Sequence, residues 1–199
     1  MAHYSDADPA VASQRHHVPL LLPDLSLELA TDRGVFARHG VDPGTKLLLL
    51  ESPGPPAEGD LLDLGCGYGA IAVVLARRAP HATIWAVDVN RRALELTEAN
   101  ATAAGVDNVR AVLPEALPDD IRFATIWSNP PVRIGKGPLQ ALLADWLARL
   151  GDGGHASLVV HKHLGADSLA RWLVAQRFPT QRLSSRMGYR LLRVGGRVG

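Results

Sequence analysis

The residues best suited to chemistry in this sequence lie in short turns that follow apolar runs. The first turn is in 60–70, DLLDLGCGYGA, where an apolar run, a glycine-rich turn and the apolar helical pattern of 71–79 follow one another. This order of strand, glycine turn and helix is typical of the nucleotide-cofactor turn of an open parallel sheet. Gly65 permits a sharp turn after the strand, and Gly67 lets a ligand lie against the main chain. A helix starting near Gly69 offers unpaired N–H groups and a positive dipole end.

Two carboxylates accompany this turn. Asp63 lies two residues before the first glycine and suits a ligand with an amino group better than a pyrophosphate. Asp88 follows the next apolar run, and its two oxygens can accept both hydroxyls of a ribose. Asp88 has an alternative role as the N-cap of the helix expected over 91–104, a role that Asn90 can fill equally well.

A second turn, Ser128-Asn129-Pro130-Pro131, follows the apolar run 123–127. Two consecutive prolines remove two backbone donors and stiffen the turn, which leaves carbonyl oxygens free to accept hydrogen bonds. A rigid turn that presents the side-chain oxygen of Asn129 and the carbonyl of Pro130 suits an exocyclic amine with two hydrogens to place. Holding both N–H groups directs the nitrogen lone pair at an electrophile, which is catalysis by positioning. Taken alone, the turn is equally compatible with an ordinary rigid loop.

The elements that must position these turns alternate between strands and helices from residue 60 onward. This alternation predicts an α/β fold with a Rossmann-like, seven-stranded, doubly wound sheet, and the final hairpin predicts an antiparallel last strand. Ligands of such sheets bind at the carboxyl ends of the strands, where the polar turns lie. Strands are expected over 60–64, 82–87, 109–112, 123–127, 156–160, 180–185 and 189–194, and helices over 70–78, 91–104, 138–150 and 166–176.

The first 52 residues are expected to form a small β extension. A Pro- and Gly-rich stretch at 52–56 marks its end, so the predicted domains are 1–52 and 53–199. Alternation of apolar and polar side chains favours strands in the extension. Three strands are expected there, over 18–22, 25–31 and 46–50, with turns at 32–34 and 41–44.

Composition excludes several classes of protein. A single cysteine, Cys66, rules out an intrachain disulfide and fits a reducing, cytoplasmic setting. No signal-peptide pattern is present, and no apolar run approaches the roughly 18 residues of a membrane span. The eight histidines lack zinc-site spacing, and His161 and His163 alternate on a strand end, so no metal site is expected.

Charge is spread unevenly along the chain, although the net charge is only +1. Residues 1–132 carry 10 Lys and Arg against 17 Asp and Glu, whereas residues 133–199 carry 11 against 3. A basic C-terminal third is compatible with an anionic partner such as RNA. It is equally compatible with a solvated surface.

The glycine turn with its upstream acid, 63–70, and the Asn-Pro-Pro turn together resemble the class I S-adenosylmethionine (SAM) methyltransferases that act on amino groups. The motif of that family is N/D-P-P-Y/F. Residues 31–36 and 41–45 further resemble the small-domain family of ribosomal RNA guanine-N2 methyltransferases, in which a G-x-F segment precedes the SAM domain. The resemblance runs from about residue 30 to the end. It implies methyl transfer from SAM to the 2-amino group of guanine in ribosomal RNA, or in the small ribosomal subunit, in the cytoplasm.

The resemblance also implies roles for individual residues. Glu115 would accept the adenine amino group of the cofactor, although it also fits a plain surface glutamate. Val132 stands where the family has an aromatic residue that stacks on the target base, and Arg133 replaces the usual histidine and could stack on a base or hold a phosphate. The implied set is Asn129, Pro130 and Pro131 for catalysis, Asp63, Gly65, Cys66, Gly67, Gly69, Asp88, Val89, Glu115 and Asn129 for SAM, and Phe36, Val132, Arg133, Lys136 and Lys162 for RNA.

Other functions account for parts of the pattern. The glycines, with Ala70 in the last position, also fit the dinucleotide motif G-x-G-x-x-G/A, and Asp88 lies at about the spacing of a ribose contact, as in a nicotinamide-dependent oxidoreductase. That hypothesis leaves the Asn-Pro-Pro turn unexplained. A methyltransferase could instead act on a protein amide or a small-molecule amine. A catalytically silent RNA-binding module would not need Asp63, Asp88 and Asn129 intact.

Overall fold

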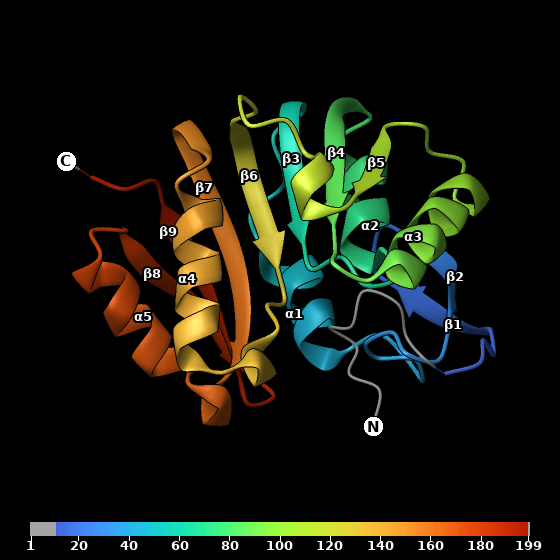
Figure 1. Cartoon of the computed structure of the whole chain (residues 1–199), viewed down its shortest axis with the longest axis horizontal. Helices are drawn as coiled ribbons and strands as arrows, with labels where there is room; N and C mark the ends of the chain where they lie inside the picture. The colour runs from blue at the N-terminus through green and yellow to red at the C-terminus, as the bar shows by residue number, and fades with distance from the viewer. Residues whose placement is uncertain (1–10, 199) are drawn as a thin grey trace.

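The computed structural model describes residues 11–198 and contains a seven-stranded sheet flanked by helices and a separate two-stranded sheet (Figure 1). The large sheet has the order β5-β4-β3-β6-β7-β9-β8. Strands β3 to β7 pair in parallel, and β9 runs antiparallel to both of its neighbours. The predicted Rossmann-like sheet with an antiparallel last strand is therefore confirmed. Its strands are β3 (Glu58–Leu64), β4 (His81–Val87), β5 (Val109–Val112), β6 (Phe123–Ser128), β7 (Leu150–His161), β8 (Thr180–Arg186) and β9 (Tyr189–Gly195).

Within residues 11–198, five α-helices cover the two faces of this sheet. One hydrophobic cluster joins α1, α2 and α3 to one face, and a second joins α4 and α5 to the other. Helix α2 is buried at every residue from Ala70 to Ala76, which agrees with its apolar pattern all round. The helices are α1 (Pro43–Glu51), α2 (Ala70–Arg78), α3 (Arg91–Ala103), α4 (Lys136–Leu147) and α5 (Ala166–Ala175), with short 3-10 turns at η1 (Pro114–Ala116), η2 (Val132–Ile134) and η3 (Lys162–Leu164).

The strand predicted over 46–50 is wrong, because these residues belong to helix α1. Asp42 caps the helix: its side chain accepts the amides of Gly44 at 2.8 Å and Thr45 at 3.1 Å. Pro43 occupies the first helical turn, where its missing N–H costs no intrahelical bond. A short apolar run such as 47–50 fits a buried helix as well as a strand, so periodicity alone did not decide between them.

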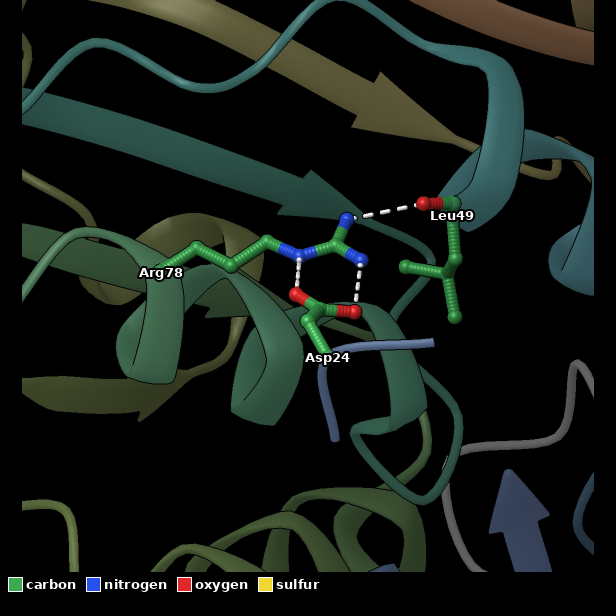
Figure 2. A network of polar contacts seen from close by, with 3 residues as sticks. All are labelled: Asp24, Leu49 and Arg78. Atoms are coloured by element: carbon green, nitrogen blue, oxygen red, sulfur yellow. Dashed lines mark hydrogen bonds and ion pairs between the residues drawn. The ribbon is translucent and has the colours of Figure 1, made fainter. Parts of the chain in front are cut away.

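The N-terminal segment is a β-hairpin followed by this helix. Strands β1 (His16–Leu21) and β2 (Ser26–Thr31) pair antiparallel, and one arginine side chain fastens their turn to the rest of the molecule (Figure 2). Arg78 donates to the two carboxylate oxygens of Asp24 at 2.8 and 2.9 Å and to the carbonyl of Leu49 at 2.7 Å. The hydrogen bond from Arg78 lowers the pKa of the Asp24 carboxyl. The hairpin turn, α1 and α2 thus meet at a single guanidinium group.

The hairpin also packs against α3, at the edge of the molecule (Figure 1). Asn100 of α3 exchanges two hydrogen bonds with the backbone of Ala30, at 2.7 and 2.8 Å. Hairpin residues Val18, Leu20 and Leu29 belong to the same hydrophobic cluster as α1 and α2. The described parts of the two predicted domains therefore share a core, and a boundary at residue 52 stays a prediction; the first ten residues of the extension lie outside the described chain.

Candidate active site at the carboxyl edge of the sheet

A cavity of about 500 Å³ lies at the carboxyl ends of β3, β4, β6 and β7. This volume falls in the range of small-molecule sites. Because β9 runs antiparallel, its first residue, Tyr189, pairs with the last residue of β7, His161, and lies at the same edge. The cavity therefore has two sides, which we call the glycine-turn wall (Gly65, Gly67 and Asp88) and the tyrosine wall (Asp42, His161 and Tyr189).

The glycine-turn wall is held open by backbone geometry. Gly65 and Gly67 have φ values of 75° and 56°, in the left-handed region that favours glycine. A Cβ at Gly65 would meet no atom within 4 Å, and one at Gly67 would meet only Val35 at 4.0 Å. The amide of Gly65 donates to the carbonyl of Val87 at 2.8 Å, which fixes the turn to the end of β4. Both glycines therefore leave room for a ligand against the main chain, an approach that the sequence analysis expects at Gly67.

Asp88 lines the cavity directly beside this turn. Its carboxylate accepts the amides of Gly67 at 2.9 Å and Asn90 at 3.0 Å, one on each oxygen. Burial raises the pKa of Asp88, and these backbone hydrogen bonds oppose the shift. The N-cap of α3 is Asn90, whose side chain accepts the amide of Ala93 at 3.3 Å. Asp88 is thus not the helix cap, and its carboxylate can still accept a hydrogen bond from a ligand hydroxyl.

Asp63, at the end of β3, and the turn residues Cys66 and Gly69 do not line the cavity. Asp63 is fully buried and accepts the amide of Ala72 at 2.9 Å, while its second oxygen, Oδ1, has no hydrogen-bond partner. Burial raises the pKa of Asp63 to about 8, and the charge of Asp88 adds to the shift. A Cβ at Gly69 would lie 2.8 Å from Thr97, so this glycine serves packing. Direct cofactor contact by these three residues stays a prediction.

The Asn-Pro-Pro turn lies between the two walls, and all three of its residues line the cavity. The Asn129 side-chain nitrogen donates to Asp42 Oδ2 at 2.9 Å and to Thr45 Oγ1 at 3.1 Å. Both of its hydrogens are then engaged, so the carboxamide oxygen is what Asn129 can offer to a ligand. The Pro130 carbonyl accepts the Val132 amide at 2.8 Å and keeps one lone pair, so its contact with an amine stays a prediction.

The residues predicted to bind RNA divide into two groups. Phe36, Val132 and Arg133 line the cavity, as does Val89 from the cofactor set. Lys136 and Lys162 are exposed at the starts of α4 and η3 but do not line it. Glu115 is also exposed, on η1, and does not line the cavity, although its neighbour Pro114 does.

Several residues of the cavity were missed from the sequence, chiefly those of the tyrosine wall. Tyr189 donates its hydroxyl to Asp42 Oδ1 at 3.3 Å, and its ring meets that of His161 edge-on at 4.9 Å between centroids. Burial, together with the negative charge of Asp42, raises the pKa of Tyr189. The Asp-Pro-Gly sequence at 42–44 was a readable helix start. No local signal marks Tyr189 or the cavity residue Trp146 of α4.

The described residues contain no group of three or more His, Cys, Asp and Glu side chains that could hold a metal ion. Over residues 11–198, no helix is long and apolar enough to cross a membrane.

Known proteins are similar to this chain in sequence and in fold. Residues 26–193 match the family described as "Methyltransferase small domain". An uncharacterized protein of Bacillus subtilis, YbxB, is 36% identical over 169 residues, covering 83% of this chain and 84% of its own. The ribosomal RNA small subunit methyltransferase C of Serratia proteamaculans is 35% identical over 144 residues, which are 69% of this chain but only 41% of that protein.

A solved structure with the same fold is the T. thermophilus 16S rRNA N2 G1207 methyltransferase, in complex with AdoMet and guanosine. It superimposes with a TM-score of 0.78 at 26% identity, over 95% of this chain and 52% of that one. The glycines without side chains and the half-buried carboxylate of Asp88 suit the ribose-bearing cofactor of this family. The chain therefore belongs to the methyltransferase small domain family of SAM-dependent methyltransferases, and S-adenosyl-L-methionine is its cofactor.

Proposed function

We propose that this protein transfers the methyl group of SAM to the exocyclic 2-amino group of a guanine in ribosomal RNA. The observation that carries the proposal is the state of Asn129, whose amide hydrogens are both engaged by Asp42 and Thr45 at the cavity wall. Its oxygen is therefore placed to accept an N–H from an amine. The names of the ribosomal RNA methyltransferase relatives and of the guanosine complex support this choice of amine.

The residues of the glycine-turn wall would hold the cofactor. Asp88 would accept the ribose hydroxyls, and Gly65 and Gly67 would admit the cofactor against the main chain. The start of α2, just beyond, is a positive dipole end. When bound, SAM supplies a methyl group on a positively charged sulfur. The role of this wall is then to fix that methyl group in place beside the Asn-Pro-Pro turn.

The Asn-Pro-Pro turn would hold the amine. One N–H of the amine would donate to the Asn129 oxygen and the other to the remaining lone pair of the Pro130 carbonyl. The lone pair of an amino group on a purine is delocalised into the ring, and holding both hydrogens out of the ring plane frees it for attack. The rate would then come from positioning, which can contribute several orders of magnitude.

Two features support RNA as the molecule that carries this amine. The C-terminal third is basic, and its Arg133 lies at the cavity. Exposed Arg133 lines the cavity mouth beside the turn. Other basic residues of this region are already in surface ion pairs: Arg186 with Glu51 at 3.0 Å, and Arg182 and Arg190 with Asp167 at 3.7 and 3.6 Å. The side chains of Arg182 and Arg186 are well exposed in these pairs, which makes the pairs weak, so phosphates can compete for these two arginines.

The test is methyl transfer from labelled SAM to ribosomal subunits, to naked ribosomal RNA and to total protein, followed by nucleoside mass spectrometry. We expect label in N2-methylguanosine from ribosomal RNA, and loss of that product in Asn129→Ala. Label in another nucleoside would refute the guanine assignment. Label confined to protein would refute RNA as the substrate and favour an amide acceptor.

A further inference from the structure

We propose that Asp42 is a positioning residue that fixes which end of the Asn129 carboxamide faces the cavity. This inference rests on the proposed function for its catalytic meaning, but its geometry stands independently. Asp42 and Asn129 are 87 residues apart in the chain, and the N-terminal helix α1 brings them together. The N-terminal segment would thereby complete the active site rather than merely precede the SAM-binding domain.

The geometry of Asp42 supports a choice between two orientations. A carboxamide has nearly the same shape after a half-turn, which exchanges its oxygen and its nitrogen. An ionised carboxylate only accepts hydrogen bonds, so Asp42 attracts the Asn129 nitrogen and repels the oxygen. The 2.9 Å bond from Asn129 Nδ2 to Asp42 Oδ2 is this pairing. In the opposite orientation, the nitrogen would face the cavity and oppose the hydrogens of an incoming amine.

Asp42 is itself held firmly enough to impose that choice. Its Oδ2 also accepts the amides of Gly44 and Thr45, and its Oδ1 accepts the Tyr189 hydroxyl. Gly44 lets the Tyr189 ring lie against the first turn of α1, since a Cβ there would be 2.5 Å from the ring. The carboxylate is therefore bound on one side by a helix terminus and on the other by the last strand, and rotation about its own axis is restricted.

Thr45 supplies a second, weaker constraint. Its hydroxyl oxygen accepts the other Asn129 hydrogen at 3.1 Å, and the side chain is buried. A hydroxyl can both donate and accept, so Thr45 would tolerate either orientation of the carboxamide. Asp42, which cannot donate, is the member of the pair that discriminates between them.

The variants can separate this role from helix capping. In Asp42→Ser the N-cap is preserved, because Ser is as good a cap as Asp, but the shorter side chain cannot reach Asn129 and Tyr189. We expect turnover to fall about tenfold or more through misplacement of the amine, with SAM affinity unchanged. In Asp42→Asn the carbonyl oxygen still accepts at the same place, so most of the turnover should be retained. Thr is another short capping residue, so Asp42→Thr can be used if the Asp42→Ser variant does not fold.

Two measurements test whether Asp42 acts through Asn129. In a double-mutant cycle, Asp42→Ser should cost no further turnover in an Asn129→Ala background, because its effect passes through Asn129. Independently of activity, the side-chain amide signals of Asn129, identified by their loss in Asn129→Ala, should show slow hydrogen exchange with water. That exchange should accelerate in Asp42→Ser and stay slow in Asp42→Asn.

The outcomes also separate this inference from the proposed function. A full additional loss in the cycle, or Asn129 amide exchange that is unchanged in Asp42→Ser, would overturn the positioning role. Absence of methyl transfer to RNA by the unaltered protein would overturn the substrate assignment, while the exchange measurement would still decide the role of Asp42.

Discussion

The two walls of the cavity are built in different ways. The glycine-turn wall comes from the single stretch 58–88, because β3, its turn, α2 and β4 follow one another along the chain. Its polar contacts, such as Gly67 to Asp88, join positions 21 residues apart. The tyrosine wall joins Asp42 to Tyr189 across 147 residues. One wall is a local motif, whereas the other is a product of the sheet topology.

Because of this difference, we expect the two walls to affect different steps, cofactor binding and turnover. Substitutions in the glycine-turn wall should change cofactor affinity, because we assign this side of the cavity to the cofactor and its residues are held by their own backbone. Substitutions at the Asn-Pro-Pro turn and the tyrosine wall should change turnover, because there a carboxamide is oriented by side chains from distant elements.

The largest effect is expected at Asn129. Asn129→Ala removes the acceptor for the reacting amine, so turnover should fall roughly a hundredfold or more while SAM affinity stays nearly constant. Single-turnover kinetics and calorimetry with SAM would measure the two quantities. A variant that loses SAM but keeps its rate at saturation would place Asn129 among the cofactor ligands.

Asp88 should show the opposite behaviour. Asp88→Ala removes the acceptor of the ribose hydroxyls and should weaken SAM binding by about 1.5–3 kcal/mol, as for hydrogen bonds to charged groups. Asn90→Ala is the matched control, because it removes the α3 cap without removing the carboxylate. Unchanged SAM affinity in Asp88→Ala, measured by calorimetry, would contradict the assignment of this wall to the cofactor.

Because the pKa of Asp63 is raised in the folded protein, we expect the stability of the protein to depend on pH. The folded pKa of Asp63, about 8, lies above the ordinary value of 3.8, so the folded protein binds the extra proton between these values. Stability should therefore decrease as the pH rises through that window, by up to about 1.4 kcal/mol per pH unit. In Asp63→Asn, which can still accept the Ala72 amide, denaturant melts from pH 5 to 8 should show a flatter profile. An identical slope in both proteins would refute the raised pKa.

The smallest effect is expected for the exposed basic residues Arg133 and Lys136, which lie just after the Asn-Pro-Pro turn. Charge reversal of Arg133 and Lys136 together should weaken RNA binding and flatten its dependence on salt, because fewer counterions are released from the phosphates. SAM affinity should not change. Filter binding across a salt series is the measurement, with reversal of the remote, exposed Arg171 as the control. Salt-independent RNA affinity in the unaltered protein would contradict electrostatic recognition.

Much of the fold was predictable because local patterns determine it. The predicted bounds of helix α2 and strand β5 agree with the structure, and the glycine turn, Asp88 and the Asn-Pro-Pro turn all meet at one cavity. Strand-end positions in a parallel sheet converge by topology alone, so alternation of strands and helices sufficed to bring them together.

The remaining features depend on contacts between distant segments. The length of β7 is one example: it begins at Leu150, which was expected to be the last residue of a helix. Gly154 packs so closely against β6 that a Cβ would lie 2.8 Å from the carbonyl of Phe123, a contact that no local pattern reveals. The approach of Tyr189 to Asp42 likewise depends on the pairing of β9 with β7.

A crystal structure of the protein with S-adenosylhomocysteine and guanosine would test the role of Asn129 most directly. We expect the Asn129 side-chain oxygen within about 3.2 Å of the guanine 2-amino nitrogen, a normal hydrogen-bond distance. We also expect that Asn129 Nδ2 remains on Asp42 and that the ribose of the cofactor lies on Asp88. A guanine amino group bound away from Asn129, or a carboxamide turned with its nitrogen to the base, would contradict the central claim.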